Sequence, residues 1–105
     1  MTEKEIYKGL ESLGYPVAYS HFAEGNVPDP PYITYYYSGT DNFSADGIVY
    51  VPINEVEIEL YSKVKDTEAE KKIADWLTEK GLFYEKLEYY IESEKMIQVV
   101  FETEI

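Results

Sequence analysis

The segment NEVEIELYSKV, residues 54–64, constrains the fold of this chain more than any other segment. Apolar residues alternate along it with acidic, aromatic and basic ones. Because successive side chains of a strand point to opposite faces of a sheet, this alternation predicts a strand with one buried and one solvated face. The buried face is expected to carry Val56, Ile58, Leu60 and Val64, and the solvated face Glu55, Glu57, Glu59, Tyr61 and Lys63.

Four further stretches are predicted as strands. A short one covers 17–22, a tyrosine-rich one 32–37, and two at the end of the chain cover 83–92 and 96–105. Residues 48–51 continue the strand pattern until Pro52 interrupts it. The residues expected to face the core from the last two strands are Phe83, Leu87, Tyr89 and Ile91, with Glu85 as an exception, and Ile97, Val99, Phe101 and Ile105.

Two amphipathic helices are indicated by their caps and their apolar spacing. Thr2 and Glu5 form a capping-box pattern before the first helix, which Gly14 and Pro16 end. Thr67 and Glu70 give the same pattern before the second, which Gly81 ends. The apolar faces are predicted to carry Ile6, Leu10 and Leu13 in the first helix, and Ala69, Ile73, Trp76 and Leu77 in the second.

These elements predict one α+β domain over residues 1–105, in the order α-β-β-β-α-β-β. An antiparallel sheet of about four to five strands would have two helices packed on one face. A proline-rich loop at 23–31 and a hairpin-like loop at 38–47 would interrupt the regular structure.

The loop at 38–47, SGTDNFSADG, combines oxygen-bearing side chains with one phenylalanine. Part of it matches the first, third, fifth and sixth positions of an EF-hand calcium loop, but the twelfth position is Ile53 where a bidentate Glu is required. We therefore interpret the loop as a contact for a neighbouring protein, against the alternative of a mobile hairpin tip. The contact residues would be Asp41, Asn42, Phe43, Ser44, Asp46 and Gly47.

Catalysis is not predicted, and no cofactor or metal is expected. The chain has no cysteine, and its single histidine, His21, is not accompanied by a nucleophile motif. Glu55, Glu57 and Glu59 could form a carboxylate cluster for acid–base chemistry, because strand geometry would place successive ones about 6.5–7 Å apart on one face. Their strict alternation with apolar residues instead favours a solvated acidic face.

The charge of the chain argues against direct nucleic-acid binding. Nine lysines, no arginine and 21 acidic residues give a net charge of -12, so no basic patch is available for phosphates. No apolar run approaches the roughly 18 residues of a membrane span, and the charged N-terminus is unlike a signal peptide. We expect no membrane partner and a cytoplasmic site of synthesis.

Several segments together resemble a family of small proteins encoded in the tail-gene clusters of long-tailed phages and prophages of Gram-positive bacteria. The similarity runs from Tyr7 to Glu104, and its most specific pieces are DNFSADG and YIESEKMIQV. The other segments that carry it are YPVAYSHF, PPYITYYY, VEIELYSKVKDTEAEKKI and FYEKLEYYIESEKMIQVVFETEI.

The family is that of the tail-completion, or tail-to-head joining, proteins, which are tail-terminator-like. The resemblance implies a non-catalytic virion protein at the tail-head junction, assembled in the host cytoplasm as a homo-oligomeric ring, typically of six. Its partners would be the tail tube and the head connector, and the free protein could be a monomer. The residues at 39–47 would then touch a neighbour, and the face of Glu55, Glu57 and Glu59 could line the lumen.

Two alternatives remain open at this point. A head-completion or connector protein is the nearest one within the same class. An acidic inhibitor or regulator that mimics DNA belongs to a different class, and it requires acidic groups arrayed over one continuous surface.

Overall fold

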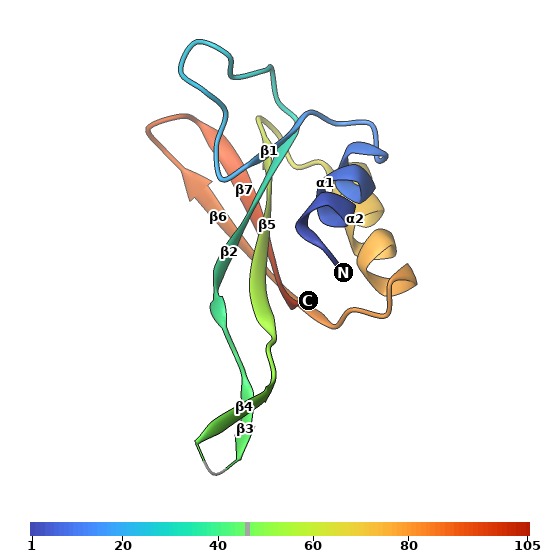
Figure 1. Ribbon diagram of the computed structural model, residues 1–105. Helices are drawn as coiled ribbons and strands as arrows, with labels where there is room; N and C mark the ends of the chain where they lie inside the picture. Colours follow the sequence, from blue (N-terminus) through green and yellow to red (C-terminus); the bar gives the residue numbers. More distant parts are fainter. Residues whose placement is uncertain (46) are drawn as a thin grey trace.

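The computed structural model describes residues 1–45 and 47–105. Within them the chain forms two helices, a five-stranded sheet and a two-stranded hairpin, so the fold is α+β as predicted (Figure 1). The elements are α1 (Glu3–Glu11), β1 (Val17–Tyr19), β2 (Tyr32–Thr40), β3 (Phe43–Ala45), β4 (Ile48–Val51), β5 (Asn54–Ser62), α2 (Thr67–Glu79), β6 (Tyr84–Ile91) and β7 (Met96–Glu104).

The five-stranded sheet is mixed rather than wholly antiparallel. Its strand order is β1-β2-β5-β7-β6, and β1 runs parallel to β2 while the other neighbours are antiparallel. The connection through residues 20–31 explains the difference, because a link of about a dozen residues lets the chain return and start β2 in the same direction as β1.

The first helix starts as its sequence predicts, and the second starts differently. Thr2 and Glu5 form the capping box of α1. The N-cap of α2 is Asp66, whose Oδ1 accepts a hydrogen bond from the amide of Ala69 at 3.0 Å. The prediction that Thr67 caps this helix with Glu70 is therefore wrong by one residue. Asp is a strong N-cap, and it leaves the Glu70 side chain to point inward.

The core lies between one face of the sheet and the two helices, which lie on the same side of it in Figure 1. The helices approach closely at Gly9, where a Cβ would lie 2.5 Å from the indole ring of Trp76. Glycine at this position makes room for the ring. Fully buried members of the core are Ile6, Leu10, Ile33, Tyr35, Ile58, Leu60, Ala69, Ile73, Leu77, Val99 and Phe101.

The outer strand β6 presents the opposite face from the one predicted. Lys86 pairs with Phe101 and Glu88 with Val99, so Lys86 and Glu88 share the helix-covered side with these core residues. Leu87, Tyr89 and Ile91 therefore lie on the other side of the sheet, and Phe83 is exposed. The apolar alternation was misleading because, after Tyr84, which packs against the core, the inner side of this edge strand carries the ion pairs of Lys86 with Glu70 and of Glu88 with Lys65.

Val64 was also predicted to face the core, and it is exposed because β5 ends at Ser62. The loop predicted at 38–47 is instead largely strand. β2 continues to Thr40, and β3 and β4 pair into a hairpin beyond it. Within the described residues, β4 was predicted to have strand character, whereas β3 and the extension of β2 to Thr40 were not. We call residues 38–45 and 47–53 the arm, since they extend away from the helix-covered body (Figure 1).

Candidate functional site

The face of the sheet opposite the helices is the candidate functional surface, and we call it the open face. Side chains reach it from alternate positions of four strands, as the strand registers require. They are Tyr32, Thr34 and Tyr36 of β2, Glu55, Glu57, Glu59 and Tyr61 of β5, Gln98, Val100, Glu102 and Glu104 of β7, and Glu85, Leu87, Tyr89 and Ile91 of β6.

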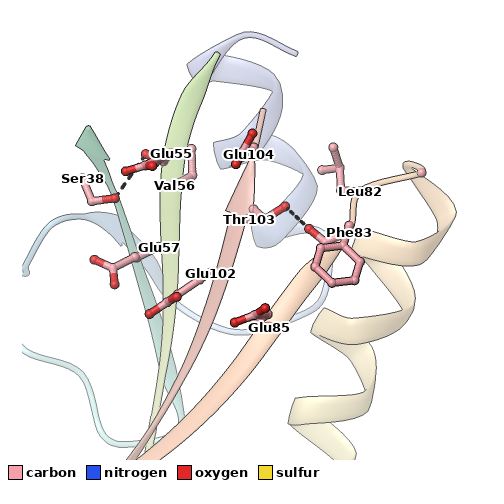
Figure 2. Close-up of a pocket in the computed structure, with 11 residues that line it drawn as sticks. Ser38, Glu55, Val56, Glu57, Leu82, Phe83, Glu85, Glu102, Thr103 and Glu104 are labelled. Atoms are coloured by element: carbon pink, nitrogen blue, oxygen red, sulfur yellow. Dashed lines mark hydrogen bonds between the residues drawn. The ribbon is translucent and has the colours of Figure 1, made fainter. Parts of the chain in front are cut away.

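Five glutamates gather at one end of this face, which we call the acidic end. Glu55 lies directly opposite Glu104, and Glu102 lies between Glu57 and Glu85 on the neighbouring strands. On the other neighbouring strand, β2, Gly39 pairs with Glu55. A Cβ at position 39 would lie 3.2 Å from the Glu55 carboxylate. These side chains line a hollow of about 600 Å³ together with Ser38, Val56, Gly81, Leu82, Phe83 and Thr103 (Figure 2).

The acidic end is electrostatically uncompensated. In the part of the chain that the structure describes, every lysine that forms an ion pair does so with an acidic residue of α2 or with Glu88. Reduced hydration, followed by the nearby carboxylates of Asp41 and Glu55, raises the pKa of Glu104 above its ordinary value. Like charges directly opposite each other destabilise a sheet, so this arrangement costs folding free energy.

Glu57 and Glu59 have different surroundings although they share one strand face. The hydroxyl of Tyr36 donates a hydrogen bond to Glu57, and this bond, with burial, raises the pKa of Tyr36 to about 12. Glu59 is half-buried, and its carboxylate accepts hydrogen bonds from Thr34 at 3.0 Å and from Gln98 at 2.7 Å. Burial nevertheless raises the pKa of Glu59.

The other end of the open face is aromatic. The Tyr32 and Tyr61 rings stack at 5.2 Å, and the Phe22 ring meets Tyr32 edge-on at the same centroid distance. The connection through residues 20–31 therefore covers this end. The structure separates an acidic end, whose side chains line the hollow, from an aromatic end that this connection partly covers.

The arm carries the residues predicted as an interaction loop. The Asp41 amide donates to the Ile53 carbonyl at 2.9 Å, and the Asn42 Oδ1 accepts from the Ile53 amide at 3.1 Å. In the hairpin backbone, Phe43 is paired with Val51 and Ser44 with Val49. Gly47 has a φ of +75°, which glycine adopts readily, and Asp46 lies outside the described residues.

The described residues do not bring catalytic or metal-binding groups together. The His21 ring is exposed, with its Nδ1 3.1 Å from the Ser20 Oγ, and no carboxylate in the described part of the chain is hydrogen-bonded to that pair. Across residues 1–45 and 47–105, no group of three acidic or histidine side chains has the geometry to hold a metal ion. None of the helices in these ranges is long and apolar enough to span a membrane.

Comparison of the chain with models of known protein families and with curated protein sequences gives no match. The candidate site therefore stands on its own geometry. Sequence reasoning found Glu55, Glu57 and Glu59 but missed Glu85, Glu102 and Glu104. Glu85 was the one acidic residue on a strand face that was predicted to be buried. This exception indicated that the predicted buried face of β6 is in fact the face turned away from the helices.

Proposed function

We propose that this protein is a phage virion assembly protein that completes the tail and joins it to the head connector, working as a ring. The observation that carries the proposal is the two-sidedness of the domain. Helices cover one side of the sheet, the other side exposes an uncompensated acidic end, and an arm extends beyond both. The resemblance of the sequence to tail-completion proteins supports the same assignment.

The acidic end is the kind of surface along which DNA can pass without binding. Double-stranded DNA carries one negative charge per about 1.7 Å of its axis, so a lumen of like charge repels it. In a ring with Glu55, Glu57 and Glu102 facing the lumen, each subunit contributes carboxylates that no lysine neutralises in the described part of the chain. The arm would contact a neighbouring subunit, the tube or the connector.

Deletion of the gene from the phage or prophage that encodes it tests this proposal. We expect lysates that contain DNA-filled heads and separate tails, seen by negative-stain electron microscopy. Antibody-gold labelling of wild-type particles should mark the tail-head junction. Joined particles in the deletion lysate, together with absence of the protein from purified virions, would rule the proposal out.

The lumen assignment has its own test. The double variant Glu102→Lys/Glu104→Lys reverses charge at the acidic end, and Glu24→Lys/Glu79→Lys makes the same net change on exposed sites elsewhere. We expect joined particles from both but slower DNA release from the first. Equal release rates would place the acidic end outside the DNA path.

The gathering of five glutamates on one face also favours a second candidate, an acidic protein that mimics DNA and occupies the site of a DNA-binding protein. The two candidates differ in location and in phenotype. A DNA mimic would be absent from virions, and its deletion would leave heads and tails joined.

A further inference from the structure

The edge strand β6 exposes Leu87, Tyr89 and Tyr90, and Phe83 is exposed directly before it. Phe83 is 82% exposed, Tyr90 62%, Tyr89 51% and Leu87 40%. Among the described residues, β6 pairs with β7 alone, so its other edge is a long edge of the sheet without a partner in this part of the chain. A long edge strand with exposed apolar residues is a template for pairing with another chain.

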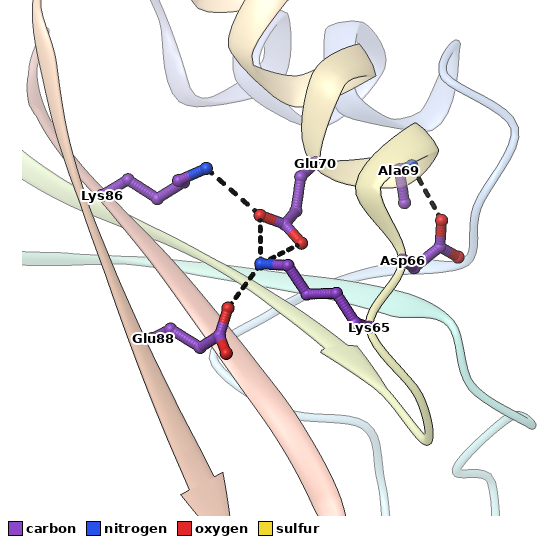
Figure 3. Close-up of polar contacts among 6 residues, drawn as sticks. All are labelled: Lys65, Asp66, Ala69, Glu70, Lys86 and Glu88. Atoms are coloured by element: carbon purple, nitrogen blue, oxygen red, sulfur yellow. Dashed lines mark hydrogen bonds and ion pairs between the residues drawn. The ribbon is translucent and has the colours of Figure 1, made fainter.

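The same strand carries opposite charges two residues apart on its inner side. Lys86 Nζ lies 3.2 Å from the buried carboxylate of Glu70, and Lys65 Nζ lies 2.8 Å from Glu70 and 2.5 Å from Glu88 (Figure 3). Lys86 and Glu88 remain about half exposed, at 47% and 48% of their side chains. Each therefore retains room for a further partner.

We propose that the partner of β6 is a second copy of this chain, paired antiparallel about a two-fold axis with Leu87 opposite Leu87. Directly opposite residues of an antiparallel pair lie on the same sheet face. With Leu87 on the axis, a residue that lies before Leu87 in one copy faces the residue that lies equally far after Leu87 in the other. Lys86 then lies opposite Glu88 of the second copy, twice by symmetry. The other cross-strand pairs are Tyr84 with Tyr90, Glu85 with Tyr89, and Phe83 with Ile91.

Charge selects this register over its neighbours. Centring the pair on residue 86 would place Lys86 opposite itself, and centring it on residue 88 would place Glu88 opposite itself. Like charges directly opposite each other are destabilising, whereas opposite charges and apolar or aromatic pairs stabilise. Charged residues commonly protect edge strands against pairing. Here Lys86 and Glu88 lie on either side of Leu87, so with Leu87 on the axis each of them faces the opposite charge of the second copy.

The proposed contact concerns the free protein and does not rest on the proposed function. A two-fold contact uses the same surface on both copies and closes on itself, so it gives a dimer and cannot propagate into a ring. Ring assembly would require the two edges to separate.

Sedimentation of the purified chain over a wide concentration range tests the proposal first. We expect a reversible dimer of twice the 12.2 kDa chain mass. Leu87→Asp and Leu87→Lys should each be monomeric, because like charges then meet at the axis, while their equimolar mixture should dimerise again. Val64→Asp, at an exposed apolar site off the edge, should dimerise like the wild type.

A cysteine scan fixes the register. The chain has no cysteine, and directly opposite residues have Cα atoms about 4.5–5.5 Å apart, within the range of a disulfide. Leu87→Cys should therefore oxidise to a covalent dimer. Tyr89→Cys should not, because its counterpart lies about 13 Å along the strand. A monomer at all concentrations, a dimer that survives Leu87→Asp, or efficient cross-linking through Tyr89→Cys would each overturn the proposal.

Discussion

Replacing Glu102 by glutamine should stabilise the protein, although it removes a charge from the surface proposed to function. Glu102 lies directly opposite both Glu57 and Glu85. Two unit charges about 5 Å apart in a water-like medium repel by about 0.8 kcal/mol. Cross-strand pairs contribute about 0.2–1 kcal/mol each. Relief of two such repulsions predicts a gain of about 1 kcal/mol in the free energy of unfolding at neutral pH and low salt.

Urea unfolding followed by tryptophan fluorescence measures this gain. With a slope of about 1–2 kcal/mol per molar urea, the midpoint should rise by about 0.5–1 M. At about 1 M salt the Debye length falls to about 3 Å, so the gain should shrink to less than half. Glu24→Gln, on an exposed loop site, serves as the matched control and should leave the midpoint unchanged. A neutral or destabilising Glu102→Gln, or a gain that salt does not reduce, would refute the reasoning.

Three further predictions follow from the contacts around the sheet. Glu70→Ala should cost about 2 kcal/mol, because the buried carboxylate that pairs with two lysines is lost. Glu70→Gln should lose about as much because it also removes the charge, and a Glu70→Gln variant as stable in thermal unfolding as the wild type would argue against an ionic role. Because the folded pKa of Glu59 is raised, the contribution of this group to stability is fully present below its unfolded pKa and is lost as pH rises through the folded value. In chemical denaturation, the free energy of unfolding of Glu59→Gln relative to the wild type should therefore increase as pH rises through the folded pKa of Glu59. A difference that is the same at all pH values would contradict the raised pKa of Glu59. Asn42→Ala removes the side-chain bond to the Ile53 amide, so hydrogen exchange at that amide should accelerate about tenfold while the midpoint of global unfolding stays in place; an unchanged exchange rate would show that the bond does not hold the arm.

The parts of the fold that depend on local patterns could be predicted from the sequence. The alternation around Ile58 gave the correct buried face of β5, and Thr2 with Glu5 gave the start of α1. These signals are local, because the residues that decide them lie within one strand or one helical turn.

The parts that depend on distant partners could not be predicted. Leu87 and Tyr89 read as core residues, but the inner side of β6 is held by an ion pair between Lys86 and Glu70, which is remote in sequence. The acidic end arises only when Glu102 is brought between two other strands. Pairing between strands is a tertiary property, and one sequence does not reveal which strands are neighbours.

Joining of heads and tails in vitro tests the proposed function most directly. Purified protein is added to a lysate of the deletion phage that contains unjoined heads and tails, and infectious particles are counted. We expect the wild-type chain to restore plaques in proportion to the amount added, and a chain lacking residues 41–52 of the arm, shown to be folded by circular dichroism, to restore few. Failure of the folded wild-type chain to join heads to tails, or full activity without the arm segment, would contradict the proposed role.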